Sequence, residues 1–237
     1  MGGRRVHEGE LTPAPMVRTS PNDERAGTAA AEGAFVVVIL IIISLATTFQ
    51  NTEVIGRGVN IGDTAPELVS QAHMMGSDEW DSFNLADEIN PQWAEGDSGK
   101  HILIDFIDTD CPYCWASAPE MTEINEKYGE NIKMFTVVVS FVELQGHEGS
   151  RDEIIAYQEK LSGEMCKASQ VDCAEREGNP HDWPFIDDLD LSERSKWDVE
   201  GTPSYFLLKP NGEIVWTSDK NAGLSIDQAV AAVVGGV

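Results

Sequence analysis

Basic residues are scarce in this chain. Of its 237 residues, 16 are Lys or Arg and 41 are Asp or Glu, which gives a formal net charge of −25 at pH 7. A protein that binds DNA or RNA needs a basic face to neutralise the backbone phosphates. The composition therefore excludes a nucleic acid as a partner.

Cysteine is also rare, because the chain has only 4. That number is too small for a fold held together by disulfides alone. With 41% hydrophobic and 24% charged residues, the chain is instead typical of a globular domain with its own core. The four cysteines fall into two close pairs, Cys111 with Cys114 and Cys166 with Cys173. Close pairing of this kind is typical of redox or metal sites.

Only one long hydrophobic run is present, at residues 33–49 (GAFVVVILIIISLATTF). It has no charge and reaches the length of about 17 residues that a helix needs to cross a bilayer. We predict a disordered tail over 1–32, a transmembrane helix over 33–49, a linker over 50–60 and a folded domain over 61–237. The alternative is a cleaved signal peptide with Ser44-Leu45-Ala46 as its small-x-small site.

Arginines lie mostly before the hydrophobic run, which predicts that the N-terminus stays in the cytoplasm. The folded domain is then expected outside the cell membrane, in the periplasm or the extracellular space. Disulfides persist in such compartments. The predicted location therefore suits thiol chemistry at the cysteine pairs.

Strand and helix patterns alternate along the predicted domain, which favours an α/β fold with a mixed sheet. Residues 162–190 are polar and read as an irregular insertion. The sequence predicts strands over 101–107, 132–142, 204–209 and 213–218, and helices over 112–128, 151–161 and 225–234.

Cys111-Pro112-Tyr113-Cys114 lies where the first predicted strand gives way to a helix. Backbone N–H groups at a helix N-terminus stabilise a thiolate, so Cys111 is expected to be an exposed nucleophile and Cys114 a more buried resolving thiol. Half of a zinc site is the alternative, but the spacing of the second pair does not match one. Asp108 and Asp110, like Asp105, crowd Cys111 in sequence, which predicts a raised thiol pKa.

Three further residues strengthen this motif. Asp105 lies in the middle of an apolar strand, where burial should raise its pKa, although it could also be a simple ion-pair partner. Pro119 falls inside the predicted helix and should bend it. Thr202-Pro203 opens the hairpin, and a cis bond there would leave backbone groups free to pair with a bound chain.

Together, the strand Asp, the CxxC at a helix start, the helix Pro and the downstream Thr-Pro resemble the thioredoxin superfamily over about residues 60–237. Gly62-Asp63-Thr64-Ala65-Pro66 resembles the opening of the membrane-anchored TlpA/ResA-like branch, an opening that peroxiredoxins share. The resemblance implies a thioredoxin fold, a redox-active Cys111–Cys114 disulfide, Asp105 as buried proton acceptor and Pro203 as a substrate-orienting cis-proline.

The chain also departs from the family pattern. Asp110 stands where the family often has Trp, and the Pro-Tyr between the cysteines is more like glutaredoxins. Thr109 precedes Cys111 by two residues rather than the three of the peroxiredoxin threonine motif, which disfavours a peroxiredoxin.

The remaining candidates are expected to be structural. Cys166 and Cys173 are predicted to form a disulfide that pins the insertion, with a second, electron-relaying redox pair as the alternative. His73 beside Met74 and Met75 could suggest copper, but scattered surface and core residues are the preferred interpretation. No role is predicted for the other histidines of the domain: His101, His147 and His181.

The sequence thus predicts an extracytoplasmic thiol:disulfide oxidoreductase of the protein-disulfide reductase type, without cofactor or metal, acting in cytochrome or metalloprotein maturation. Its expected partners are protein thiols and disulfides, the membrane, and an unidentified electron donor or acceptor. Thr202, Pro203, Pro112 and Tyr113 are expected to contact the substrate. The alternatives are a disulfide-forming oxidase, a Cu(I)-binding assembly factor and a redox-inert interaction domain.

Overall fold

The structure is a computed structural model that describes residues 56–220 and 223–235. The predicted tail (1–32), the predicted transmembrane helix (33–49) and most of the predicted linker lie outside the described residues. Among the helices that are described, none has the length and apolar character to cross a membrane.

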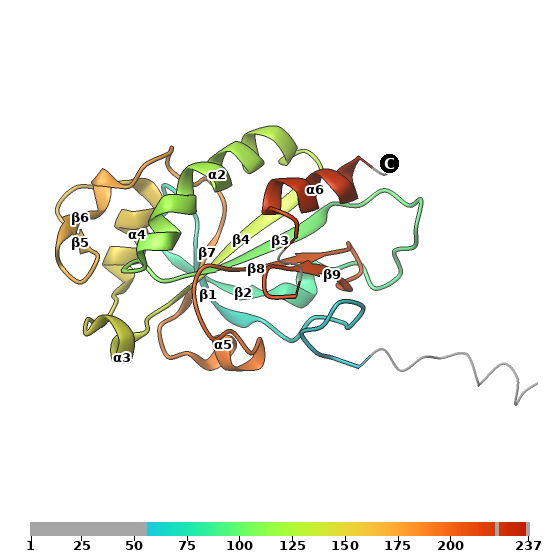
Figure 1. Ribbon diagram of the computed structural model, residues 1–237, viewed down its shortest axis with the longest axis horizontal. Coiled ribbons are helices and arrows are strands. Elements are labelled where there is room, and N and C mark those ends of the chain that lie inside the picture. Colours follow the sequence, from blue (N-terminus) through green and yellow to red (C-terminus); the bar gives the residue numbers. More distant parts are fainter. Residues whose placement is uncertain (1–55, 221–222, 236–237) are drawn as a thin grey trace, which may run out of the picture. The chain divides into compact units, whose positions relative to one another are not determined.

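Seven strands form one mixed sheet in the order β2-β1-β7-β4-β3-β8-β9 (Figure 1). The central strands β3, β4 and β7 are parallel to one another, and the outer strands pair antiparallel. The strands are β1 (Val69–His73), β2 (Trp80–Asn84), β3 (His101–Ile107), β4 (Ile132–Val139), β7 (Phe185–Asp188), β8 (Ser204–Leu208) and β9 (Ile214–Thr217).

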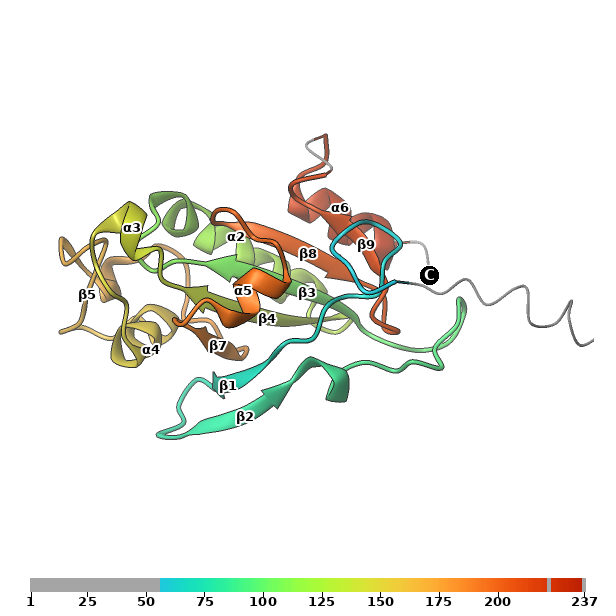
Figure 2. The same ribbon diagram turned by 90° about the horizontal axis from the view of Figure 1, so that it is seen from below.

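Helices cover both faces of this sheet. Figure 1 shows α2 (Pro112–Tyr128) and α6 (Ile226–Val234) above the sheet and α5 (Ser192–Lys196) below it, and Figure 2 shows α5 from its own side. The other helical elements are η1 (Leu85–Asp87), α3 (Val142–Gln145), α4 (Arg151–Glu159) and η2 (Cys173–Glu175), and a separate hairpin consists of β5 (Met165–Cys166) and β6 (Val171–Asp172).

The central strand β3 is buried on both faces because apolar residues alternate between two cores. Leu103 and Ile107 belong to the core on the α2 side, whereas Ile104 and Phe106 belong to the core on the α5 side. Successive side chains of a strand point to opposite faces. Asp105 shares the parity of Leu103 and Ile107, so this carboxyl lies on the face that α2 covers.

Several predicted elements are confirmed. Strand β3 and helix α2 have the predicted bounds, and Gly129 is the C-cap of α2. The Asn-Gly hairpin of β8 and β9 is present, and Ser225 begins α6 through a capping box with Gln228. The α/β fold class with a mixed sheet is therefore as the sequence predicts.

Other predictions were wrong in their bounds. The strand expected over 132–142 ends at Val139, and Val142 already begins α3. Lys160, with a left-handed φ of 59°, ends the helix predicted to reach residue 161. Residues 162–190 are not uniformly irregular, since they contain β5, β6, η2 and the sheet strand β7. The edge hairpin β1–β2 (VSQAH and WDSFN) gave no signal because its residues are largely polar.

The insertion after α4 contains an internal disulfide and also contacts the body of the domain. Cys166 and Cys173, both fully buried, form a disulfide. The Arg176 side chain is fully buried and donates hydrogen bonds to the carbonyl oxygens of Tyr157 and Asn179, at 2.8 and 2.9 Å. The Arg176 hydrogen bond to the Tyr157 carbonyl thus holds the insertion against α4, and a sequence pattern does not reveal this contact.

Candidate active site

The cysteine pair lies at the junction of β3 and α2. Cys111 is the N-cap of α2, Pro112 takes the first helical position, and the Cys111 N–H donates to the Asp108 carbonyl at 3.0 Å. Proline suits this position because the first N–H groups of a helix have no intrahelical acceptor. The Cys114 N–H points to Cys111 Sγ at 3.4 Å, so the helix N-terminus faces the first sulfur.

The two thiols, both free in the structure, have opposite acid–base character. Hydrogen bonds from the Cys114 thiol and from backbone N–H groups of Tyr113 and Cys114 lower the pKa of Cys111 to about 6, although burial opposes them. Burial and the hydrogen bond to Cys111 raise the pKa of Cys114 well above its usual range. The arrangement therefore favours a Cys111 thiolate beside a protonated Cys114.

Two predictions for Cys111 are corrected here. The residue is only 4% exposed rather than open to solvent. Its pKa is lowered rather than raised, because hydrogen bonds to the sulfur outweigh burial, and the neighbouring carboxylates of Asp108 and Asp110 have partners of their own. Asp108 accepts from the N–H groups of Asp110 and Phe141, and Asp110 accepts from Ala168 N–H and faces His147. Closeness in sequence did not make these carboxylates hydrogen-bond partners of the sulfur.

Asp105 is buried next to the cysteine pair. Its pKa is raised well above the usual range by burial and by the nearby Cys111, in the direction that the sequence predicts. Its Oδ1 atom has no hydrogen-bond partner among the described residues. A buried carboxyl with a free oxygen can take up a proton from a thiol that must ionise.

A loop from the neighbouring strand completes the site. The Thr202–Pro203 peptide bond is cis, and the Thr202 carbonyl oxygen lies 3.2 Å from Cys111 Sγ. Pairing of β8 with β3 sets this approach, since Tyr205 lies opposite Asp105 in the antiparallel register. Of the predicted substrate contacts between the cysteines, Pro112 is exposed and Tyr113 is 75% exposed. These side chains form the accessible rim of the pair.

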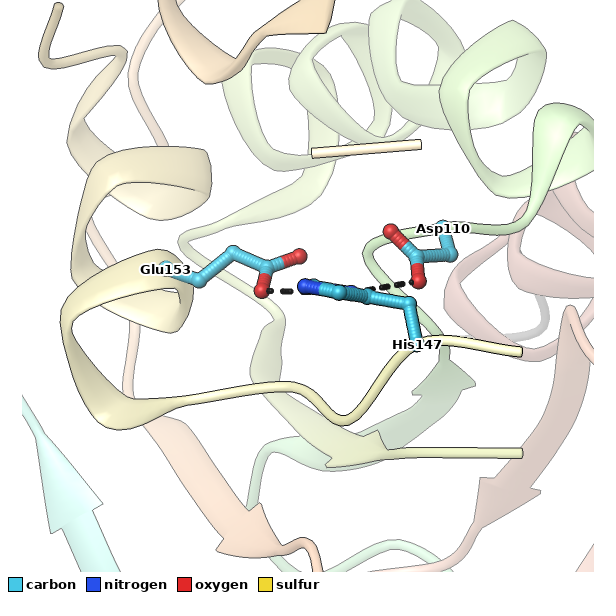
Figure 3. Close-up of side chains that lie close together, drawn as sticks. All are labelled: Asp110, His147 and Glu153. Atoms are coloured by element: carbon cyan, nitrogen blue, oxygen red, sulfur yellow. Dashed lines mark hydrogen bonds and ion pairs between the residues drawn. The ribbon is translucent and has the colours of Figure 1, made fainter. Parts of the chain in front are cut away.

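The sequence missed a cluster next to the nucleophile, formed by Asp110, His147 and Glu153 (Figure 3). His147 Nδ1 lies 2.9 Å from an Asp110 oxygen and 3.9 Å from a Glu153 oxygen. Asp110 and Glu153 are buried, and His147 is partly exposed. Because His147 comes from the loop after α3 and shares no motif spacing with the cysteines, no sequence signal could have revealed the contact.

Other predicted candidates lie apart from the pair. The Gly62–Pro66 segment contacts the β8–β9 hairpin, where Ala65 N–H donates to the Gly212 carbonyl at 2.9 Å. His73 is fully buried, and its ring nitrogens lie 2.6 Å from Gln158 Oε1 and 2.8 Å from the Ser77 carbonyl. Gln158 and Ser77 thus satisfy the His73 ring.

The Thr109 hydroxyl donates to Glu153 at 2.6 Å, so this threonine is directed to the cluster around His147.

Comparison with known proteins identifies the family. The model of the thioredoxin-like domain matches residues 94–218, more than half of the chain, and the protein belongs to this family. The match includes both cysteine pairs, Asp105 and the Thr202–Pro203 bond. No curated protein matches the chain in sequence.

Solved structures share the fold at low identity. A reduced 2-Cys peroxiredoxin from Plasmodium vivax aligns with a TM-score of 0.50 at 15% identity and covers 73% of this chain and 80% of its own. A secreted Mycobacterium tuberculosis disulfide oxidoreductase homologous to Escherichia coli DsbE aligns with a TM-score of 0.45 at 11% identity. The alignment covers 70% of this chain and 95% of that protein. The thioredoxin domain of a Bacteroides vulgatus thiol-disulfide oxidoreductase aligns with a TM-score of 0.46 at 16% identity. The alignment covers 76% of this chain and 99% of that domain. At 15% identity, the likeness to the Plasmodium vivax protein concerns the fold alone.

Proposed function

We propose that the protein is a thiol:disulfide oxidoreductase that exchanges electrons between Cys111–Cys114 and cysteines of partner proteins. One observation carries the proposal: a thiol with a pKa lowered to about 6 and a thiol with a raised pKa share the first turn of a helix that faces a cis-proline loop. The first can attack at neutral pH, and the second stays protonated until it must resolve the intermediate.

In the reducing direction, the Cys111 thiolate attacks one sulfur of a partner disulfide. A bond forms between Cys111 and that sulfur while the partner disulfide breaks, and the released partner thiolate takes a proton from solvent. Cys114 then loses its proton to the ionised carboxylate of Asp105 and attacks Cys111 Sγ, which releases the second partner thiolate. The partner gains two electrons, and Cys111–Cys114 becomes a disulfide.

The Thr202–Pro203 loop would orient the partner chain. The Thr202 carbonyl already lies 3.2 Å from Cys111 Sγ, so an extended peptide that reaches the sulfur also reaches this backbone. The exposed Tyr113 ring, between the two cysteines in sequence, offers an apolar contact. We include Thr202, Pro203, Pro112 and Tyr113 in the proposed partner site on this ground.

Our more specific proposal is a reductase of the TlpA/ResA type, anchored by residues 33–49 with its domain outside the cytoplasm and active in cytochrome or metalloprotein maturation. The uncharged apolar run and the arginines before it support the anchor. Cys111, with its lowered pKa, would attack oxidised partners. An electron donor outside this chain must then restore the Cys111–Cys114 dithiol.

A redox titration of the purified full-length protein tests the proposal. Each cysteine pair is trapped at defined thiol/disulfide ratios and assigned by mass spectrometry. We expect Cys111–Cys114 to titrate reversibly at a potential near thioredoxin's, about −270 mV, as a reductase requires. A potential near about −120 mV would overturn the reductase assignment in favour of a disulfide-forming oxidase.

Failure of Cys111–Cys114 to titrate would overturn the enzymatic function itself. Matched variants test the roles of the two cysteines. Cys114→Ser should accumulate the mixed disulfide, and Cys111→Ser should form none. Metal analysis of the reduced protein serves as a control. Stoichiometric copper that disappears in Cys111→Ser would also count against the proposal and favour a copper-handling protein.

A further inference from the structure

Asp110 is joined directly to the nucleophile Cys111, yet both of its carboxylate oxygens have other partners. Oδ1 accepts the backbone N–H of Ala168 at 2.6 Å, and Oδ2 lies 2.9 Å from Nδ1 of His147. The residue is only 4% exposed. Its carboxylate is therefore held from two sides, by two segments that lie 37 and 58 residues away in sequence.

We call His147 and the Ala168 N–H, which hold the Asp110 carboxylate, the clamp. On the His147 side, the clamp is itself fixed. Figure 3 shows the imidazole between Asp110 and Glu153. Because a carboxylate oxygen can only accept, Nδ1 must donate to Asp110. Glu153 lies 3.9 Å from the same Nδ1 through one oxygen and accepts the Thr109 hydroxyl at 2.6 Å through the other. The imidazole is thus confined by groups from α4 and from the segment before Cys111.

The Ala168 side is a turn that the chain adopts at a conformational cost. Lys167, Ala168 and Ser169 all have left-handed φ angles, of 51°, 53° and 62°. Residues with a Cβ rarely adopt this conformation, and three in succession are unusual. The Cys166–Cys173 disulfide closes the hairpin around the turn, and Lys167 Nζ lies over the Trp115 ring at 4.2 Å. The Ala168 N–H is therefore presented to Asp110 by a constrained loop.

We propose that His147 is a positioning residue which, together with Ala168, holds the Asp110 carboxylate away from Cys111 Sγ and so preserves the reactivity of the nucleophile. The inference deepens the proposed function and rests on it. A carboxylate released next to a thiolate would disfavour the charged sulfur. The clamp explains how an acidic residue can stand directly before Cys111 without making its thiol unreactive.

Other titratable groups lie near Cys111, Asp110 and His147, and the test must leave them unchanged. Around Cys111 these are Asp105, Cys114 and Tyr157. Around Asp110 and His147 they are Asp108 and Glu153. The test therefore alters only the clamp and reads out the thiol directly.

The experiment measures the rate at which iodoacetamide alkylates Cys111 in the reduced full-length protein, from pH 4.5 to 9, with a chelator present. In His147→Ala we expect the apparent thiol pKa to rise by about one unit, which slows alkylation at pH 6 about fivefold. His147→Asn, whose amide can donate from the place of Nδ1, should stay within about 0.3 units of the parent protein.

A double-mutant cycle isolates the role of Asp110. Asp110→Asn alone should leave the thiol pKa within about 0.3 units, whereas Asp110→Asn combined with His147→Ala should cancel the shift that His147→Ala produces. A merely structural role of His147 would not be corrected by removing a charge. His147→Leu, whose side chain has no hydrogen-bond donor, replaces His147→Ala if that variant does not fold.

Two outcomes would overturn the inference: an unchanged thiol pKa in His147→Ala, or a shift that persists in the double variant. Neither bears on the proposed function, because alkylation does not require exchange with a partner. Conversely, the proposed function would be overturned if the Cys111–Cys114 pair of the parent protein failed to titrate in the redox experiment. This would hold even if the thiol pKa responded to His147.

Discussion

At the scale of single residues, Asp105 carries a free-energy cost that the fold tolerates. Burial raises its pKa, and one oxygen has no hydrogen-bond partner among the described residues. In the unfolded chain the carboxyl ionises near pH 4, whereas in the folded state it resists ionisation. Its contribution to stability is therefore fully present below about pH 4 and is lost as the pH rises through the folded-state pKa.

Asp105→Asn should consequently stabilise the protein at pH 7, by on the order of 2 kcal/mol, and should have almost no effect at pH 3. The same change should slow resolution of the mixed disulfide about 10- to 100-fold, because Cys114 loses its proton acceptor. Urea unfolding at both pH values and single-turnover exchange with a model disulfide measure the two effects. Equal stabilisation at pH 3 and pH 7 would contradict the account.

The acid–base behaviour of these residues shows where sequence reasoning succeeds and where it stops. The raised pKa of Asp105 could be predicted because burial of a strand residue follows from its own flanking residues. The lowered pKa of Cys111 was not predicted, because hydrogen bonds to the sulfur lower it while Asp108 and Asp110 direct their oxygens to other partners. Their partners, Phe141 and His147, come from distant positions in the sequence.

At the scale of elements, the disulfide-closed hairpin of β5 and β6 has a structural role that can be separated from catalysis. Both of its sulfurs are fully buried, and the bridge spans a sequence separation of 7. Closing a loop of this size lowers the conformational entropy of the unfolded chain, which raises its free energy by about 2 to 3 kcal/mol.

Replacement of both Cys166 and Cys173 by Ala should therefore lower the free energy of unfolding by about 2 kcal/mol. Exchange at Cys111–Cys114 should persist, because neither residue takes part in the proposed steps. Equilibrium unfolding and exchange with a model disulfide are measured on the same sample. Complete loss of exchange from a variant that remains folded would indicate an electron relay instead.

The elements that could be predicted are those whose own residues determine them. Strand β3 is a continuous apolar run, α2 has Pro at its start and Gly at its end, and β8–β9 is joined by Asn-Gly. Strands β1 and β2 lie at one edge of the sheet, and their polar residues resemble a loop. Strand β7 has only 4 residues and takes its place by pairing with β1 and β4.

At the scale of the whole molecule, the charge of −25 should select among partners. A protein with this excess of carboxylates attracts basic segments over a distance of about one Debye length, 10 Å at 0.1 M salt. The proposed reaction is bimolecular, so attraction before contact should change its rate.

Two disulfide peptides that differ only in flanking Lys or Glu residues form a matched pair for this test. At low ionic strength we expect the Lys peptide to react about tenfold faster, and the ratio should fall to about twofold at 0.5 M salt. A small uncharged disulfide serves as the control and should show little salt dependence. Equal rates for the two peptides at low salt would show that the charge serves another purpose, such as solubility.

The site is complete only after β8 has paired with β3 during folding. Cys111 and the Thr202 carbonyl that faces it are 91 residues apart along the chain. Contacts between such distant segments form late, because closing a long loop costs entropy before the contact is gained. A growing or partly folded chain therefore contains Cys-Pro-Tyr-Cys without the opposite wall of the site. Under the proposed function, recognition of a partner requires the finished domain, and an immature chain carries the same two sulfurs without the Thr202 wall.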